Sequence, residues 1–303
     1  MDKQHFFSHG KLLLTSEYVV LDGAKALAIP TKPGQDLSAE KIDDHRSLIY
    51  WETYREGKLW LKTCIDYKNL FVTETNIANA SAFILKIFST LKDMGSESLE
   101  ADYSYILKSN VQFPENFGLG SSSTLMNNIA NWGNVDAFAL NDIALGGSGY
   151  DIAVAKAGAP IIYTRNGGNK TVETVNYSPS FKDQLLFVHL NKKQDSREGI
   201  TMYKQMEKSQ DLIHYFSELT DEILISENLE NFSLIMEDHE KTMSIFLKIP
   251  TVKEKYFKNA PSFFKSLGAW GGDFILTTKF CDYENYFLHN GFPNFFSYDE
   301  LIY

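Results

Sequence analysis

The residues of this chain best suited to chemistry form a short turn rich in glycine and hydroxyl groups. Residues 118–124 read Gly-Leu-Gly-Ser-Ser-Ser-Thr, and a helical pattern follows them. Glycine permits a tight bend close to a ligand, and a helix start offers unpaired N–H groups with a partial positive charge, so such a turn attracts phosphate. It matches neither of the two commonest glycine-rich phosphate motifs, because no Lys follows Gly120 and Ser123 stands where a third glycine is needed.

The composition is that of an acidic globular protein. The chain has 303 residues, enough for two domains, with 44% hydrophobic and 22% charged residues and a net charge of −10. This charge argues against nucleic acid or an anionic membrane as partner. Arginine, the preferred bidentate partner of phosphate, is scarce. A phosphate site must therefore depend on backbone N–H groups, lysine and metal. The arginines are Arg46, Arg55, Arg165 and Arg197.

The sequence carries no sign of secretion, membrane insertion or a structural metal. No apolar run approaches the roughly 20 residues of a membrane span, and the first eight residues lack a signal pattern. Cys64 and Cys281 form neither a metal spacing nor a disulfide framework. The histidines show no metal spacing either, and His189, within an apolar run, is predicted to be a core residue. We expect a cytoplasmic protein.

Hydrophobic patterns and turn signals predict a mixture of strands and helices. The two strands expected in residues 5–31 turn at Asp22-Gly23, and a hairpin and then a helix follow the second strand. The mixture indicates an α+β or mixed α/β protein with a soft boundary near residues 165–182. Strands are expected near 47–54, 58–65, 103–111, 160–163, 185–190 and 274–276, and helices near 76–93, 121–132, 134–145, 150–155 and 197–247.

Further motifs accompany the first turn, which is preceded by Pro114-Glu-Asn-Phe. Residues 10–23 read Gly-Lys-Leu-Leu-Leu-Thr-Ser-Glu-Tyr-Val-Val-Leu-Asp-Gly, residues 148–153 read Ser-Gly-Tyr-Asp-Ile-Ala, and residues 268–273 read Gly-Ala-Trp-Gly-Gly-Asp. Together these motifs resemble the GHMP superfamily of small-molecule kinases, the group of galactokinase, homoserine kinase, mevalonate kinase and phosphomevalonate kinase. Residues 10–23 are similar to the family opening P-G-K-x-x-L-x-G-E-[HY]-x-V-x-x-G, residues 114–124 to P-x-x-x-G-L-G-S-S-A and residues 268–273 to G-A-G-G-G-[GD]. Residues 148–153 resemble the catalytic segment of the mevalonate branch and a subgroup with a Gly-Tyr-Asp-Ile-Ala signature.

The resemblance implies a fold and a domain division. The expected fold class is α+β, the two-domain GHMP kinase fold, with a ribosomal-S5-like N-terminal α/β domain and a ferredoxin-like C-terminal α+β domain. Residues 1–172 would form the N-terminal domain, with the phosphate loop and the catalytic aspartate. Residues 173–303 would form the C-terminal domain.

The resemblance also implies ATP-dependent phosphoryl transfer with Mg²⁺. Asp151 would orient the acceptor hydroxyl or take its proton, while Lys11 would hold Asp151 ionised and offset charge on the transferred group. The hydroxyls of Ser121 and Ser122 would reach the metal. The expected ATP-binding residues are Pro114, Gly118, Leu119, Gly120, Ser121, Ser122, Ser123 and Thr124. The expected substrate-binding residues are Glu17, Tyr18, Ser148, Gly149, Arg197, Gly271 and Gly272.

Some positions depart from the family pattern. Trp270 replaces a glycine of the last turn, and Leu140 stands near the place of a metal-binding Glu in mevalonate kinases. Asp136 or Asp142 could take the place of that Glu, or hydroxyls, waters and ATP alone could hold Mg²⁺.

The acceptor is expected to be a small hydroxy acid. Mevalonate is favoured slightly over phosphomevalonate, because arginines for a second phosphate are few. Homoserine, a sugar, the ATP-dependent decarboxylases of the same fold, a non-catalytic binder and a homodimer stay open.

Overall fold

The computed structural model describes residues 3–191, 196–268, 270 and 272–303, with residues 196–198 described by their backbone. The chain divides into two compact units, and each is discontinuous in sequence. The predicted domain boundary after residue 172 stays a prediction. Unit 1 comprises Met1–Gly10, Pro33–Glu115 and Leu119–Gly158, and unit 2 comprises Lys11–Lys32, Asn116–Gly118 and Ala159–Tyr303.

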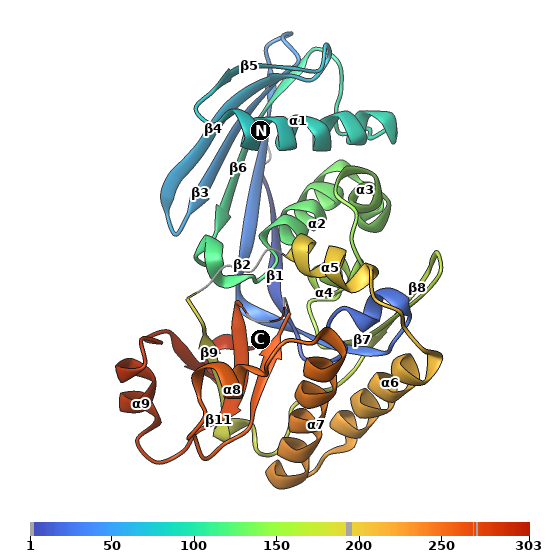
Figure 1. Cartoon of the computed structure of the whole chain (residues 1–303). Helices are drawn as coiled ribbons and strands as arrows, with labels where there is room; N and C mark the ends of the chain where they lie inside the picture. The colour runs from blue at the N-terminus through green and yellow to red at the C-terminus, as the bar shows by residue number, and fades with distance from the viewer. Residues whose placement is uncertain (1–2, 192–195, 269, 271) are drawn as a thin grey trace. The chain divides into compact units, whose positions relative to one another are not determined.

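Unit 1 is a mixed sheet with helices packed on it. Its strand order is β5-β4-β3-β6-β2, with β3 and β6 parallel and the other neighbours antiparallel. Helix α1 lies along one face of this sheet (Figure 1). The strands are β1 (Gln4–Leu13), β2 (Ala26–Asp43), β3 (Leu48–Arg55), β4 (Lys58–Asp66), β5 (Phe71–Thr75) and β6 (Tyr103–Val111), of which β1 and β2 contribute residues to both units. The helices are α1 (Ala78–Asp93), α2 (Ser121–Gly133), α3 (Ala137–Ala144) and α4 (Tyr150–Ala157).

Aromatic side chains hold the core of unit 1. The rings of Trp51 and Phe88 meet edge to face with centroids 5.9 Å apart, and Phe88 meets Trp132 in the same way at 6.0 Å. Such contacts add to the gain from burying the rings. They join β3, α1 and α2 in one core, which fixes the helix that begins at the glycine-rich turn.

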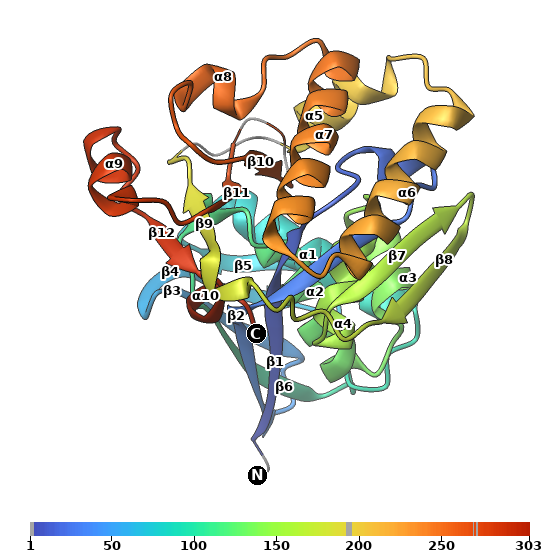
Figure 2. The same ribbon diagram turned by 90° about the horizontal axis from the view of Figure 1, so that it is seen from below.

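Unit 2 contains a small antiparallel sheet in the order β10-β11-β9-β12. Helix α7 packs against β10, and α6 lies beside α7 (Figure 2). The start of β2 pairs with β7, which forms a hairpin with β8. The strands are β7 (Ile161–Asn166), β8 (Asn169–Thr174), β9 (Leu185–His189), β10 (Phe264–Leu267), β11 (Phe274–Thr278) and β12 (Phe295–Ser297). The helices are α5 (Ser196–Lys204), α6 (Gln210–Ile225), α7 (Leu229–Leu247), α8 (Val252–Tyr256), α9 (Tyr283–His289) and α10 (Tyr298–Leu301).

Two expectations about the first strands are wrong. Strand β1 ends at Leu13, and Val19–Asp22 forms a short 3-10 helix where a strand was expected. Val19 and Val20 are fully or almost fully buried, which explains their strand-like pattern, but Ser16 and Tyr18 have φ of 62° and 61°, which no strand allows. Strand β2 also runs on to Asp43, past two prolines.

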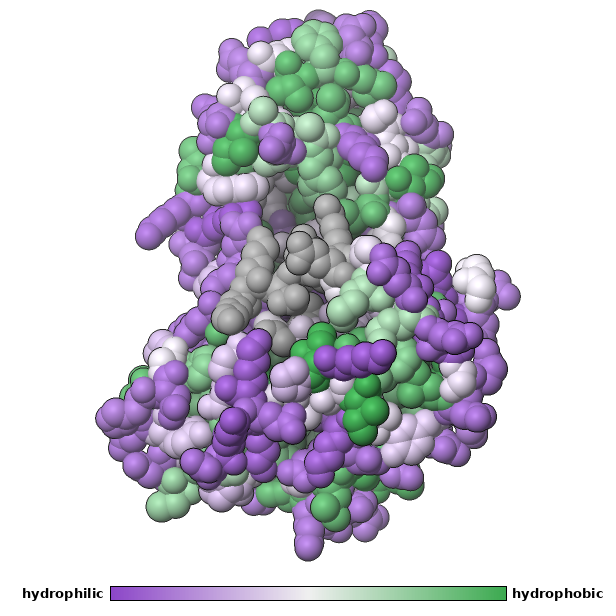
Figure 3. Space-filling model, viewed as in Figure 1, coloured by the Kyte–Doolittle hydropathy of each residue, from purple (hydrophilic) through white to green (hydrophobic). Residues whose placement is uncertain are grey.

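The visible surface of both units is mostly polar, with smaller groups of apolar residues between the polar ones (Figure 3). The exposed apolar side chains include Ile225, Leu234 and Ile245 of α6 and α7, and single exposed residues of this kind are normal. None of the helices in the described ranges combines the length and apolar character needed to cross a bilayer.

Candidate functional site

Residues 119–124 of the glycine-rich turn lead into helix α2 in unit 1. Gly120 is the N-cap residue, with φ of 82° and ψ of 40°, a left-handed conformation that suits glycine. The amide groups of Ser123 and Thr124 both donate to the Gly120 carbonyl at 3.0 Å, so the helix begins directly after this glycine. The first N–H groups of α2 thus belong to Ser121 and Ser122, as an anion site at a helix start requires.

The four hydroxyl residues of this turn differ in their surroundings. Thr124 is 1% exposed, and its Oγ1 donates to Gln35 Oε1 at 2.6 Å. Ser123 is buried as well, whereas Ser121 is exposed and Ser122 partly exposed. The contacts of Thr124 attach α2 to β2, while the hydroxyls of Ser121 and Ser122 remain at the surface of the unit, where a ligand can reach them.

Ser121 and Ser122 line a cavity of about 170 Å³ in unit 1. Arg55 and Trp60, from the β3–β4 hairpin, line it too, and the Arg55 guanidinium carbon lies 3.5 Å from the centre of the Trp60 ring. Phe83 of α1 and other apolar side chains complete the wall. A cavity with an aromatic face and hydroxyls at a helix start suits a flat, partly apolar ligand that carries an anionic group.

Sequence reasoning missed Arg55 and Trp60. The signal that could have found them is the hairpin pattern, since a strand pair places side chains from both strands on a common face. Their proximity to the residue 121–122 region depends on how α1 and α2 pack on that face, which has no local sequence signature.

Asp151 lies in the first turn of α4, which begins after Gly149 with φ of 91°. Helix α4 packs against α2, and Asn127 Nδ2 of α2 donates to the Ala155 carbonyl of α4 at 3.2 Å. Ser148 is 7% exposed at the same turn. Unit 1 therefore positions the start of α2 and Asp151 through one pair of packed helices. An acidic side chain also suits a helix start on electrostatic grounds alone.

Lys11 lies on β1 and is 9% exposed. It belongs to unit 2, whereas Asp151 belongs to unit 1, so the pairing of Lys11 with Asp151 stays a prediction.

Unit 2 places Glu17 inside its core. Glu17 is fully buried, and its Oε1 accepts a hydrogen bond from Lys265 Nζ at 2.6 Å. Burial raises the pKa of Glu17 to about 7, against the opposing effect of the Lys265 ammonium. A carboxylate in this position is suited to holding Lys265 and its own turn in place.

Within unit 2, Tyr18 contacts the glycine-rich segment of residues 268–273 and α5, the helix that contains the predicted site residue Arg197. Its hydroxyl accepts a hydrogen bond from the Trp270 amide at 3.2 Å, and its ring stacks on Tyr203 of α5 with centroids 5.7 Å apart. Gly272 is buried beside this segment. Gly271 and the side chain of Arg197 lie outside the described residues.

Gly118 approaches the last glycine-rich segment, also within unit 2. It has φ of 66°, and a Cβ built on it would lie 2.3 Å from Asp273 Oδ2. Pro114 is partly buried and Leu119 fully buried in unit 1. His189 is fully buried and its Nε2–H donates to the Asn116 carbonyl at 2.8 Å, so the prediction of a satisfied core histidine is confirmed.

Carboxylates for a metal do not gather in the described ranges, where no three His, Cys, Asp or Glu side chains are placed to hold an ion together. Leu140 is fully buried in the core, and Asp142 is exposed. Asp136 is the N-cap of α3, where its Oδ1 accepts from the Ala139 amide at 2.9 Å. Hydroxyl groups such as those of Ser121 and Ser122 fit Mg²⁺ only together with ligand phosphates and water, as this ion commonly binds.

We expect Asp136→Ala to destabilise the protein by about 1 kcal/mol, because α3 loses its cap, and Asp136→Asn to leave stability nearly unchanged, because Asn caps equally well. Urea unfolding with and without Mg²⁺ measures both variants. A Mg²⁺-dependent stability that the Asn variant loses would instead identify Asp136 as a metal ligand.

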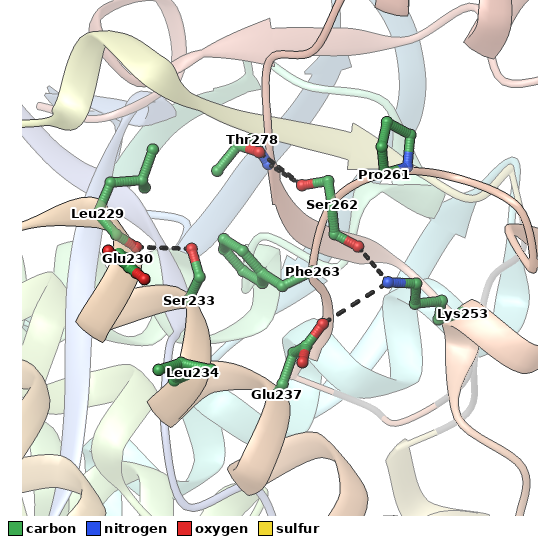
Figure 4. Close-up of a pocket in the computed structure, with 10 residues that line it drawn as sticks. All are labelled: Leu229, Glu230, Ser233, Leu234, Glu237, Lys253, Pro261, Ser262, Phe263 and Thr278. Carbon is green, nitrogen blue, oxygen red and sulfur yellow. Dashed lines mark hydrogen bonds and ion pairs between the residues drawn. The ribbon is translucent and has the colours of Figure 1, made fainter.

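Unit 2 has a cavity of about 510 Å³ beside α7 (Figure 4). Polar groups that line it bond to one another, since Lys253 Nζ donates to the Ser262 carbonyl at 2.6 Å and lies 3.6 Å from Glu237 Oε1. None of the residues predicted from the sequence lines this cavity.

Comparison with solved structures shows the fold of the chain. The L. major mevalonate kinase in complex with R-mevalonate is 14% identical, with a TM-score of 0.68 over 95% of this chain and 90% of that one. The Streptococcus pneumoniae phosphomevalonate kinase in complex with phosphomevalonate and AMPPNP is 16% identical, with a TM-score of 0.66 over 96% and 95%. The Lactococcus lactis galactokinase complexed with galactose is 14% identical, with a TM-score of 0.68 over 98% and 93%.

The chain thus has the two-domain α+β fold of these small-molecule kinases, with a mixed sheet and a second, smaller sheet. No protein-family model and no curated protein matches it.

Proposed function

We propose that this protein is a GHMP-type kinase that transfers a phosphoryl group from ATP to a small hydroxylated acceptor in the cytoplasm. The observation that carries the proposal is the start of α2, where Ser121 and Ser122 follow a left-handed Gly120 and line a cavity with Arg55 and Trp60. The fold shared with solved mevalonate kinases and galactokinase supports the same class of reaction.

The nucleotide is bound by unit 1 in this proposal. The N–H groups at the start of α2 bind the phosphates, and the Ser121 and Ser122 hydroxyls ligate Mg²⁺. The base would enter the cavity that Trp60, Phe83 and the Arg55 side chain stacked on Trp60 line. The Thr124 hydroxyl does not bind the nucleotide in this proposal, because it is hydrogen-bonded to Gln35. Thr124 instead holds α2 in position against β2.

Asp151 orients the acceptor hydroxyl or takes its proton, and Lys11 stabilises the ionised carboxylate. Positioning and charge stabilisation account for most of the catalysis of phosphoryl transfer, so few groups need to react. Ser148, Gly149, Tyr18, Arg197, Gly271 and Gly272 form the acceptor side, and Glu17 acts through Lys265 and its own turn.

Mevalonate is the first candidate acceptor, because a hydroxy acid needs one cation for its carboxylate and the chain has few arginines. Phosphomevalonate is the second, supported by the shared fold of the phosphomevalonate kinase. Homoserine, a sugar, the ATP-dependent decarboxylation of a diphosphorylated acceptor and non-catalytic binding are the further alternatives.

The deciding experiment measures ADP release from MgATP with mevalonate, phosphomevalonate, homoserine and a panel of sugars, with product analysis by mass spectrometry. A phosphorylated product of one acceptor supports the proposal, and release of CO₂ would identify a decarboxylase. Absence of turnover on the whole panel, from protein with a cooperative unfolding transition, would contradict kinase activity towards these acceptors.

We expect Ser121→Ala and Ser122→Ala each to raise the KM for MgATP by about tenfold, because each removes one hydroxyl from the nucleotide side, and to leave the acceptor KM within about twofold. Thr124→Val is the matched control, since it removes a hydroxyl that is buried against Gln35. It should lower the unfolding midpoint with little change in either KM. A change confined to the acceptor KM in the serine variants would place them on the other substrate.

A further inference from the structure

Unit 2 contains a buried cluster of ionisable side chains: Glu17, His239, Glu240 and Lys265. All four are at most 2% exposed. Lys265 Nζ lies 2.6 Å from Glu17 Oε1. It also donates a hydrogen bond to the backbone carbonyl of Ser266, the next residue in the chain. Glu240 accepts from the amides of Val252 and Ser266, at 3.1 Å and 2.9 Å. The cluster joins the turn after β1 to α7 and β10.

Burying these ionisable groups carries a desolvation penalty that offsets much of the stability gained from their attraction. His239 Nε2 accepts a hydrogen bond from the Ser16 amide at 2.8 Å, so this nitrogen carries no proton. Burial and the nearby Lys265 lower the pKa of His239 well below its usual value, which leaves two carboxyl groups facing one cation. Glu17 Oε2 has no hydrogen-bond partner among the described residues. Apolar side chains would stabilise such a core equally well, so the cluster is better explained by what it holds in position.

The cluster holds a backbone conformation that the sequence alone disfavours. Ser16 and Tyr18, on either side of Glu17, have φ of 62° and 61°. Each such residue costs roughly 1–2 kcal/mol, so surrounding contacts must impose it. His239 binds the amide of Ser16, and Lys265 binds the carboxylate of Glu17.

The held conformation determines the position of Tyr18. Its hydroxyl accepts from the Trp270 amide, and its ring stacks on Tyr203, whose own hydroxyl donates to Asp22 at 2.6 Å. A Cβ on Gly199 of α5 would lie 2.1 Å from Tyr18 Oη, so α5 approaches this tyrosine as closely as glycine allows. Tyr18 therefore touches both α5 and the turn at residue 270.

We infer that Glu17, His239 and Lys265 are positioning residues of the acceptor side: they hold Tyr18 so that it sets the position of α5 and of the turn at Trp270. The inference rests on the proposed function, which assigns acceptor binding to these two segments. None of the three side chains needs to touch the acceptor, and they act through Tyr18.

Tyr18→Phe tests the inference, because it keeps the stacked ring and removes the hydroxyl. Tyr298→Phe is the matched control, since Tyr298 is 6% exposed against 7% for Tyr18 and its hydroxyl donates to the Tyr177 carbonyl in the same unit. Hydrogen exchange followed by mass spectrometry needs no substrate. We expect faster exchange in the peptides that contain Trp270 and residues 199–204 in Tyr18→Phe, and no change there in Tyr298→Phe.

The same two variants are assayed with MgATP and mevalonate. Tyr18→Phe should raise the KM for mevalonate about fivefold, the effect of one lost hydrogen bond, with kcat and the KM for MgATP within about twofold. The pair Glu17→Gln/Lys265→Met, which removes both charges together, should increase exchange in the same peptides and in residues 14–22.

The outcomes separate the two proposals. Unchanged exchange in Tyr18→Phe, or in the charge-pair variant, would overturn the positioning role. Increased exchange with an unchanged KM for an acceptor that the wild type phosphorylates would overturn its link to the acceptor. If the wild type phosphorylates no acceptor, the proposed function fails, and exchange alone decides whether the cluster positions these segments.

Discussion

Asp151→Asn is expected to lower kcat by roughly 10²- to 10⁴-fold, the usual contribution of a positioned acid or base, while the KM for MgATP changes little. The physical reason is that a neutral amide cannot take the acceptor proton, and its oxygen attracts that proton much less strongly than an ionised carboxylate does. Single-turnover ADP release with the acceptor that supports turnover measures the effect.

Asp136→Asn is the matched control for Asp151→Asn. Asp136 is also an acidic residue beside a helix start in unit 1, and its cap on α3 tolerates Asn. It should keep near-normal kcat. A near-normal rate in Asp151→Asn itself would remove Asp151 from the mechanism and leave its carboxylate as a favourable charge at the start of α4.

Lys265→Met is expected to have the largest effect on stability, a loss of about 3–5 kcal/mol, because it leaves Glu17 buried without its cation. The double variant Glu17→Gln/Lys265→Met should recover much of this loss, since the Glu17 charge is removed together with its cation. Glu240 still loses the nearby ammonium but keeps its bonds to the Val252 and Ser266 amides. Chemical unfolding of the wild type, the two single variants and the double variant gives the coupling energy. Additive effects of the two single changes would contradict the pairing.

The free energy of unfolding that Lys265→Met loses should also depend on pH. The direction of this dependence follows from the raised pKa of Glu17. The folded pKa of Glu17 is about 7, above the ordinary 4.5, so the folded state binds its proton more tightly than the unfolded state. This group therefore favours folding at pH below about 4.5, and that contribution is lost as the pH rises through 7. Without Lys265 the proton binds more tightly still, so we expect a larger difference between variant and wild type at pH 8 than at pH 5.

Elements with local signals were predictable from the sequence. The hairpin of β3 and β4 follows the alternation of buried and exposed side chains, with Glu56 and Gly57 in the turn. Helix α1 follows its apolar spacing, and α2 begins directly after the glycine-rich turn. In each case the pattern that indicates the element is made by neighbours in the chain.

Features that depend on distant partners were not predictable. The positive φ of Ser16 and Tyr18 accompanies bonds from α7 to the Ser16 amide and from β10 to the Glu17 carboxylate. The valines that follow have a strand-like pattern, so no neighbouring residue indicates this conformation. Thr124 is hydrogen-bonded to Gln35 of β2, which is distant in the sequence. The sequence therefore could not indicate that the Thr124 hydroxyl is buried whereas Ser121 and Ser122 are accessible. Arg55 and Trp60 are candidate ligand-binding residues only because the folded chain places them beside Ser121 and Ser122 in one cavity.

The ion pair between Glu17 and Lys265 has a consequence for biosynthesis. Lys265 follows Glu17 by 248 residues, so at about 5–20 residues per second the ribosome needs roughly 12–50 s to supply the partner of a turn made near the start of the chain. The last residues of unit 1 emerge within that interval, and so do β7 and α6, which contact the Val19–Asp22 helix. A chain stopped before Lys265 would leave the Glu17 carboxylate without its cation, so we expect the Ser16–Tyr18 turn to reach its final conformation only after β10 has been synthesised.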